Sequence, residues 1–176
     1  MLLENLRRKI WTGRLRRKKR ILSFSRPVNV RERIARSATI CICMPDDHKY
    51  FYEARDCLKD IRKKGLRITL VLNRKLELLA EHPGKTAIYP DPPKKPFPLR
   101  ESLFGAIPPD FDIAIDLSPQ PTAMTAYITG TRGKKLTIGP ESGKYDPFYT
   151  VLVKPSDSYP ASVMTMLSMA GLTSRT

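Results

Sequence analysis

The sequence predicts a three-layer α/β domain with a mostly parallel sheet, preceded by a basic helical N-terminal arm. Two observations predict this organisation. From residue 38 onward, short apolar runs alternate with segments of helical periodicity, which is the order typical of βαβ units. Before residue 38, basic side chains are interleaved with apolar ones at helical spacing. We therefore divide the chain into an arm over residues 1–37 and an α/β domain over residues 38–176.

The arm holds most of the excess positive charge. The chain has 32 Lys and Arg against 17 Asp and Glu, a net charge of +15. Thirteen of the basic residues lie in residues 1–37, where the acidic residues are Glu4 and Glu32, so the arm carries +11 and the remaining 139 residues carry +4. Helical spacing of apolar residues predicts an amphipathic helix over residues 3–22, broken or bent at Gly13. After a linker, the sequence predicts a second short helix over residues 28–37.

In the first half of the domain, the sequence predicts three strands and two helices. A nearly continuous apolar run over residues 39–44 is typical of a strand that is covered on both faces. Apolar residues at spacings of three and four predict a helix over residues 47–64, which Gly65 would end. The next elements are a strand over residues 66–72, a short helix over residues 74–81 and a strand over residues 85–89. Five prolines in residues 90–98 then predict an extended surface connection.

The second half continues the alternation. A short helix over residues 99–104 precedes a strong strand over residues 111–117. The elements predicted after it are a helix around residues 123–128, strands over residues 135–138 and 149–153, and a helix over residues 158–170 that stops at Gly171.

Polar residues after the first predicted strand form the main candidate site. Asp46, Asp47 and His48 lie at the carboxyl end of that strand, where open α/β sheets place their ligands. One interpretation is that Asp46 or Asp47 caps the following helix, because a carboxylate there accepts backbone N–H groups. The other interpretation is catalysis.

Other motifs that could bind phosphate or metal are weak. The sequence has no GxGxxG or GxxxxGK[ST] motif. The glycine-rich segment over residues 139–144 does not open a clear helix, and we interpret the basic segment over residues 131–135 as an ordinary connection. The three cysteines, Cys41, Cys43 and Cys57, lack zinc-ribbon spacing, so we expect buried thiols in a reducing compartment and neither a metal nor a cofactor.

The sequence also gives little support for a catalytic carboxylate pair or a catalytic nucleophile. Asp112 and Asp116 share one face of a predicted strand but lie roughly 13 Å apart, too far for paired acid and base work. Ser118 lacks the glycines of a nucleophile elbow, and His82 precedes Pro83 in a predicted turn.

No apolar run reaches the roughly 18 residues that cross a bilayer, and the N-terminus lacks the apolar segment of a secretory signal. We therefore expect a cytoplasmic protein.

Three segments together carry a resemblance to a known family. Residues 111–139 read FDIAIDLSPQPTAMTAYITGTRGKKLTIG, residues 38–72 read as a strand, a loop with aspartates, a helix and a second strand, and residues 166–172 read MLSMAGL. These segments resemble parts of glycosyltransferase family nine, the lipopolysaccharide heptosyltransferases. Residues 111–139 are similar to that family's (Y/F)DxxIDL strand, small-residue helix and IG strand. Residues 38–72 are similar to its opening unit, and residues 166–172 to its LLxxxGL segment. The resemblance implies a Rossmann-like domain equivalent to that family's N-terminal half.

The resemblance also implies a candidate catalytic residue. Asp47, or less well Asp46, falls at the position of the family's catalytic aspartate, and Asp47 would act as a general base on a sugar hydroxyl. The sequence departs from the family in three ways: the glycine before that aspartate is replaced, no basic residue follows IDL, and the chain reaches Thr176 without a C-terminal nucleotide-sugar domain. We therefore expect a non-catalytic glycosyltransferase-like domain that serves as a binding or assembly subunit. The alternative is one half of a split glycosyltransferase.

The arm supplies the predicted binding residues. They share a basic or stacking character and are Trp11, Arg14, Arg16, Arg17, Lys18, Lys19 and Arg20. Such an arm suits a protein partner, an anionic membrane surface at the cytoplasmic face, or nucleic acid. We expect the arm to anchor the domain within a larger assembly, with nucleic-acid binding as an alternative function.

Overall fold

The computed structural model describes residues 39–59, 61, 66–79, 85–89 and 105–173. The predicted arm, Gly65, His82, the proline-rich connection and the helix predicted over residues 99–104 lie outside the described residues.

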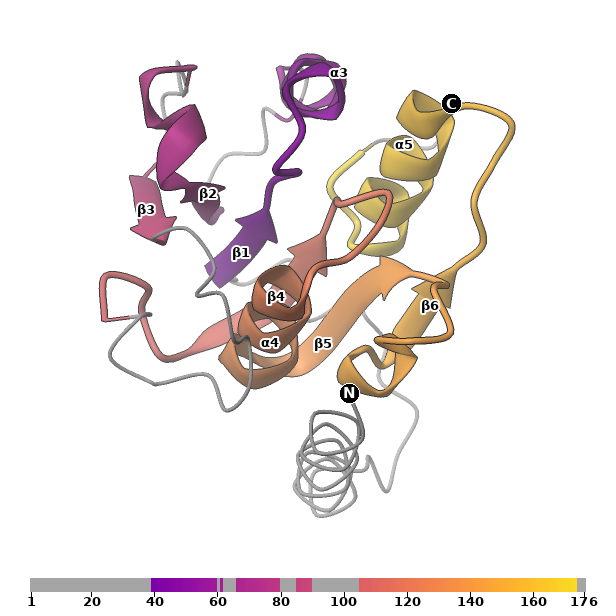
Figure 1. Ribbon diagram of the computed structural model, residues 1–176. Helices are drawn as coiled ribbons and strands as arrows, with labels where there is room; N and C mark the ends of the chain where they lie inside the picture. The colour runs from indigo at the N-terminus through magenta and orange to yellow at the C-terminus, as the bar shows by residue number, and fades with distance from the viewer. Residues whose placement is uncertain (1–38, 60, 62–65, 80–84, 90–104, 174–176) are drawn as a thin grey trace, which may run out of the picture.

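Within the described residues, six strands form one parallel sheet, whose arrangement is seen in Figure 1. The strands are β1 (Thr39–Cys43), β2 (Arg67–Asn73), β3 (Lys85–Tyr89), β4 (Phe111–Asp116), β5 (Gly133–Pro140) and β6 (Val151–Val153). Their order is β3-β2-β1-β4-β5-β6, and all five pairings between them are parallel. This order is that of a Rossmann fold, in which the chain reverses its direction across the sheet between β1 and β4. The predicted fold class is confirmed.

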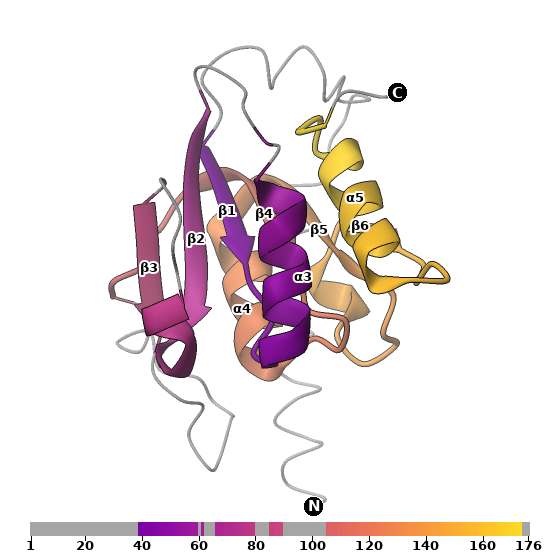
Figure 2. The ribbon, with the colours of Figure 1, turned by 90° about the horizontal axis from the view of Figure 1, so that it is seen from above.

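Helices cover both faces of the sheet, which gives three layers. The α-helices are α3 (His48–Leu58), α4 (Ala123–Arg132) and α5 (Tyr159–Met169). Helices α3 and α5 contact each other on one face, whereas α4 packs on the other face against β1, β4 and β5 (Figures 1 and 2). Two short 3-10 helices, η1 (Arg74–Leu79) and η3 (Asp146–Phe148), complete the described elements.

The apolar run of β1 is explained by burial on both faces. Ile40 and Ile42 belong to the core cluster beneath α3 and α5, and Cys41 and Cys43 belong to the cluster beneath α4. Successive side chains of a strand point to opposite faces, so a central strand between two helical layers needs apolar residues throughout. All four side chains are fully buried.

Several elements differ from their predicted form, and β5 is longer, over Gly133–Pro140 instead of residues 135–138. Helix α3 ends at Leu58 instead of residue 64, because the N–H groups of Lys59 and Ile61 donate to the carbonyls three residues earlier. The segment predicted as a helix over residues 74–81 is the 3-10 helix η1. Strand β6 begins at Val151 instead of residue 149, because the backbone N–H of Tyr149 donates to the carbonyl of Asp146 and ends η3, which the sequence did not predict.

Candidate functional site

The candidate site lies where the carboxyl ends of β1 and β4 meet. The backbone N–H of Leu117 donates to the carbonyl of Cys43 over 3.0 Å, so the two strands stay paired to their last residues. The loops that follow, over residues 44–47 and 117–122, therefore lie at the same edge of the sheet. This is the switch point at which open α/β sheets bind ligands. We call Asp46, Asp47 and Asp116 the carboxyl-edge site.

Asp47 is the N-cap of α3. Its Oδ1 accepts the backbone N–H of Lys49 over 2.9 Å and that of Tyr50 over 3.3 Å. These bonds satisfy two of the donors that a helix leaves free at its first turn, and the side chain is otherwise exposed to solvent. The capping interpretation of the sequence is confirmed. His48 is the exposed first residue of the same helix.

Asp46 is held by a tyrosine at the end of β3, which lies two strands from β1 at the same edge of the sheet. The hydroxyl of Tyr89, the last residue of β3, donates to Oδ1 of Asp46. Tyr89 is fully buried, and this burial, with the nearby charge of Asp46, raises its pKa well above the ordinary value. The hydroxyl therefore stays protonated and remains a donor, which fixes the half-buried Asp46 carboxylate in place.

Asp116 is fully buried at the end of β4. Its Oδ2 accepts the Tyr149 hydroxyl over 2.7 Å and its Oδ1 accepts the backbone N–H of Ser118 over 2.9 Å. Burial raises the pKa of Asp116, and the hydrogen bonds from Tyr149 and Ser118 oppose that rise without cancelling it. Burial and the charge of Asp116 also raise the pKa of Tyr149, so its hydroxyl remains a donor.

Two glycines make room for the segment that carries Tyr149. A Cβ added at Gly139 would lie 2.6 Å from Cδ1 of the Tyr149 ring, and one at Gly130 would lie 2.9 Å from Cδ1 of Phe148. The bare backbone of β5 at Gly139 is therefore the surface on which the Tyr149 ring rests. Without that close approach the ring would be displaced from its position beside Asp116.

A third tyrosine holds the loop after β4. The hydroxyl of Tyr159, the first residue of α5, donates to the carbonyl of Leu117 over 2.7 Å. The Tyr159 ring also meets the Tyr50 ring edge to face, with 4.8 Å between centroids. Tyrosines from β3, from the residue after η3 and from α5 thus fix the two polypeptide segments that make this edge, the loop after β1 and the end of β4.

The cysteines are not arranged for chemistry. Cys43 is fully buried, its Sγ accepts the Thr129 hydroxyl over 3.5 Å, and burial raises the pKa of its thiol well above the ordinary value. Cys41 is also buried, whereas Cys57 is only partly buried, so the expectation of three buried thiols holds for two. Within the described ranges, no three His, Cys, Asp or Glu side chains are grouped so as to hold a metal ion.

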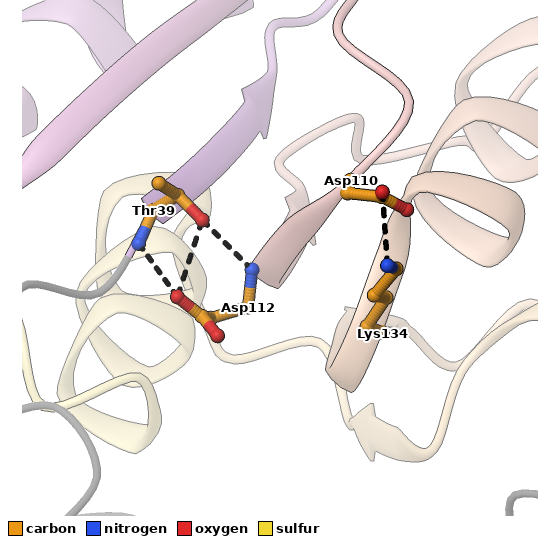
Figure 3. A network of polar contacts seen from close by, with 4 residues as sticks. All are labelled: Thr39, Asp110, Asp112 and Lys134. Atoms are coloured by element: carbon orange, nitrogen blue, oxygen red, sulfur yellow. Dashed lines mark hydrogen bonds and ion pairs between the residues drawn. The ribbon is translucent and has the colours of Figure 1, made fainter.

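Asp112 lies near the amino end of β4, whereas Asp116 is the last residue of that strand. Figure 3 shows Asp112 beside Thr39 of β1. Its carboxylate accepts both the backbone N–H of Thr39, over 2.9 Å, and the Thr39 hydroxyl, over 3.2 Å. The backbone N–H of Asp112 returns a bond of 3.1 Å to the same hydroxyl. Nearby, Lys134 pairs with Asp110 over 2.9 Å. Asp112 therefore joins the first residues of β1 and β4 and makes no acid and base pair with Asp116.

The two weak phosphate motifs have structural roles. Arg132 is buried in the last turn of α4, as part of the connection into β5. In the glycine-rich segment, the backbone N–H groups of Ser142 and Gly143 each donate to Oδ1 of Asp146 over 2.8 Å. The Asp146 carboxylate therefore binds these two backbone donors of the segment itself.

Sequence reasoning located Asp46 and Asp47 but missed the tyrosines. Tyr89 and Tyr149 are distant in sequence from the carboxylates that they bind, and no local pattern marks them. The predicted binding residues of the arm, from Trp11 to Arg20, lie outside the described residues. No described helix has the length and apolar character needed to cross a membrane.

Comparisons with known proteins agree on the fold. No family model and no curated protein matches the chain. Two solved structures share its fold: Escherichia coli heptosyltransferase WaaC with ADP, at 12% identity and a TM-score of 0.59, and a family 9 glycosyl transferase from Veillonella parvula, at 16% identity and 0.56. The similarity covers 75% and 78% of this chain but 46% and 42% of theirs. The chain therefore has the fold of part of a family 9 glycosyltransferase and spans less than half the length of these proteins.

Proposed function

We propose that the chain is a non-catalytic glycosyltransferase-like domain that acts as a binding or assembly subunit of a larger complex, anchored by its basic arm. One observation carries the proposal. Every carboxylate of the carboxyl-edge site accepts hydrogen bonds from the chain itself: Asp46 from Tyr89, Asp47 from the first turn of α3, and Asp116 from Tyr149 and Ser118.

Sugar transfer would need a carboxylate that is free to take a proton from a substrate hydroxyl. Asp116 is buried, and Asp46 is engaged by the Tyr89 hydroxyl. Asp47 is exposed, but its Oδ1 accepts the backbone N–H groups of the first turn of α3 and is committed to stabilising the start of that helix.

The two loops at this edge are also poorly suited to a phosphate. Residues 44–47 read MPDD and residues 117–122 read LSPQPT, so neither loop contains a Lys, an Arg or a Gly. Phosphate sites use cationic side chains, or glycines that let backbone N–H groups approach closely. The loops instead carry proline and acidic residues, which supports loss of catalysis on a retained fold.

The alternative is a split glycosyltransferase in which Asp47 is the general base. It is favoured by the exposed position of Asp47 at the switch point and by the length of the solved relatives, which extend well beyond the part matched by this chain. A separate polypeptide would then have to supply the nucleotide-sugar site.

Copurification tests the proposal directly. The full chain, tagged and expressed in its native cells, is purified at low salt after nuclease treatment, with soluble and membrane fractions handled separately. We expect a protein partner that is retained after nuclease treatment. Recovery of nucleic acid alone would contradict a protein-assembly role.

Substitutions of Asp47 separate the two readings. Asp47→Asn keeps the cap, because Asn is as good an N-cap as Asp, whereas Asp47→Ala should cost about 1 kcal/mol of stability. We expect Asp47→Asn to leave partner binding unchanged. If the purified complex transfers sugar from a nucleotide-sugar and Asp47→Asn abolishes that transfer while the melting temperature is unchanged, the split enzyme is correct and the proposal is wrong.

A further inference from the structure

The outward side of α3 carries basic side chains around an exposed tyrosine. Phe51, Ala54 and Leu58 are buried on the inner side of the helix, and the opposite side is centred on Tyr52, which is 38% exposed. Figure 2 shows α3 on one face of the sheet, beside α5. We call the polar residues of this outward side the α3 face, and they are His48, Lys49, Tyr52, Arg55, Asp56 and Lys59.

The excess positive charge of the α/β domain is concentrated in this helix and just after it. Residues 48–67 contain seven Lys or Arg against three Asp or Glu, a balance of +4, which equals the balance of the whole domain. The rest of the domain is therefore neutral in sum. On the α3 face, Asp56 pairs closely with Lys59, over 2.7 Å, and only distantly with Arg55, over 4.0 Å. Lys49 and Arg55 thus keep their charge for an anionic partner.

Arg55 is held in place by an aromatic ring. Its guanidinium carbon lies 4.8 Å from the centroid of the Tyr52 ring, which is a cation–π contact. The Tyr52 ring in turn meets the buried Phe51 ring edge to face, with 5.9 Å between centroids. A guanidinium that stacks through its face keeps the N–H groups of its edge for other acceptors.

The donors of Arg55 are poorly satisfied within the chain. Its Nε is buried and makes no hydrogen bond, because the 4.0 Å to the Asp56 carboxylate is too long for one. A cation that is fixed in position and lacks a good acceptor favours an acceptor from outside the chain.

We propose that the α3 face docks an acidic segment of a partner protein, with one carboxylate at Arg55 and a second at Lys49. This inference rests on the proposed function, because it names the surface and the kind of partner that a binding subunit would use. Since the Nε is buried, the first carboxylate would accept two parallel N–H bonds from the terminal nitrogens of Arg55. Tyr52 and Arg55 are of the residue types that dominate protein interfaces, and their mutual contact reduces the entropy lost on binding.

The spacing of the two cations indicates the form of the partner segment. Lys49 and Arg55 are six residues apart, which is about 9 Å along the axis of α3. In an extended segment of the polyproline II type, residues i and i+3 lie on the same side and are also about 9 Å apart. Acidic residues at every third position of such a segment would therefore reach both cations.

The same contacts disfavour nucleic acid and membranes as the occupant. Single-stranded nucleic acid stacks its bases on the faces of aromatic rings. Arg55 already lies over the Tyr52 ring, and the Nζ of Lys49 lies 5.7 Å from the centroid of the Tyr50 ring. The α3 face also has no aliphatic side chain to enter a bilayer. Carboxylates need only the charges and the N–H donors.

A site-resolved titration of the full chain tests the surface. The probe is a synthetic peptide with Glu at every third position, and the same peptide with Gln in place of Glu is its control. The backbone amide NMR shifts of residues 48–59 report on α3 separately from the basic arm. We expect the Glu peptide to shift them saturably, and less as salt is added, and the Gln peptide to leave them unchanged. Unchanged α3 shifts while the Glu peptide binds elsewhere would overturn the inference.

Substitutions separate the guanidinium from charge in general. Arg55→Gln should weaken binding of the Glu peptide at α3 about tenfold, and Arg55→Lys should weaken it nearly as much, because an ammonium lacks the paired donors. Lys49→Gln, at an exposed position that does not contribute to the core, should weaken it about threefold. The melting temperature of each variant shows that the chain is folded.

Lys144→Gln is the matched control. Lys144 also lies over a tyrosine ring, 5.0 Å from the centroid of Tyr145, but that ring belongs to the core cluster beneath α4. The substitution removes the same charge from the same kind of contact, and it should leave peptide binding at α3 unchanged. Equal weakening by Lys144→Gln and Arg55→Gln would overturn the inference.

Copurification with the same variants distinguishes this inference from the proposed function. If the wild type recovers a protein partner and the Lys49→Gln, Arg55→Gln double variant recovers as much, the α3 face is wrong and the assembly role stands. If the wild type recovers no partner but the Glu peptide binds α3, the surface stands and the assembly role is wrong. Shifts of the α3 amides with a single-stranded oligonucleotide or anionic vesicles, and not with the Glu peptide, would overturn the acidic protein segment as the occupant.

Discussion

Asp116 and its tyrosine are the part of the structure where burial and charge are most directly opposed. A carboxylate in a dry core is costly, and the chain offsets that cost with two donors, the Tyr149 hydroxyl and the backbone N–H of Ser118. The donors do not fully offset burial, because the pKa of Asp116 remains above its ordinary value. The same pairing of a buried tyrosine with an aspartate recurs at Tyr89 and Asp46. These contacts fix the edge of the sheet and leave its carboxylates occupied.

The raised pKa of Asp116 predicts how stability changes with pH. The folded chain binds the Asp116 proton more tightly than the unfolded chain, in which the pKa is roughly 3.9. The resulting stabilisation is fully present below the unfolded pKa and is lost as the pH rises through the folded pKa. Relative to Asp116→Asn, which does not titrate, the wild type should therefore lose stability as the pH is raised. Urea unfolding of both chains, from about pH 3.5 to about pH 7.5, measures this difference.

Tyr149→Phe provides the companion measurement. It removes a hydrogen bond that lowers the pKa of Asp116, so the pKa should rise further and the loss of stability should extend to higher pH. At neutral pH this variant should also be less stable than the wild type by about 1–3 kcal/mol, because the buried carboxylate loses a donor. A difference between wild type and Asp116→Asn that does not change with pH would show that Asp116 has an ordinary pKa.

At the scale of elements, two polar contacts join the amino ends of neighbouring strands, and they should differ in strength (Figure 3). Asp112 is partly buried and exchanges three hydrogen bonds with Thr39, whereas Asp110 and Lys134 are 55% and 61% exposed. Asp112→Ala should therefore lower the free energy of unfolding by about 1–2 kcal/mol. Asp110→Ala should change it by less than about 0.5 kcal/mol, because water screens an exposed pair. Chemical denaturation of the two variants makes the comparison, and an equal loss from both would contradict it.

The elements also show what could be predicted from the sequence. The strand at β1 and the cap at Asp47 were predicted because local pattern determines them: a buried central strand needs apolar residues throughout, and a helix start needs an acceptor. The 3-10 helix η3 was missed because its position depends on two distant glycines, Gly130 and Gly139, which admit Phe148 and Tyr149. Contacts between residues far apart in sequence leave no periodic signal, so the tyrosines that bind Asp46 and Asp116 could not be predicted.

At the scale of the whole molecule, the positive charge is unevenly divided between the arm and the α/β domain. The α/β domain carries +4 and has its switch-point carboxylates occupied, whereas residues 1–37 carry +11. Because a basic segment interleaved with apolar residues suits an anionic membrane surface, the arm accounts for anchoring in the proposed function. This role stays a prediction, and it can be tested independently of the partner.

Charge substitutions in the arm should weaken binding to anionic vesicles. At low salt, the full chain is expected to bind vesicles that contain an anionic lipid and not vesicles of neutral lipid alone. Each basic residue near such a surface contributes about 1 kcal/mol, so replacing Arg16, Arg17 and Lys18 with Gln should weaken binding about a hundredfold. Trp11→Ala should weaken it further, because the indole lies at the level of the headgroups when such a helix binds.

The control removes the same charge from the domain. Replacing Lys134, Lys144 and Lys154, all of which are exposed, with Gln lowers the net charge equally and should leave vesicle binding nearly unchanged. Equal weakening by both sets would mean that net charge, and not the arm, drives the binding.

Salt of about 1 M, at which the screening length is about 3 Å, should release the chain if headgroup attraction dominates. Tight binding to a short RNA duplex without any binding to anionic vesicles would instead favour the nucleic-acid function for the arm, with the affinity falling steeply as salt is added.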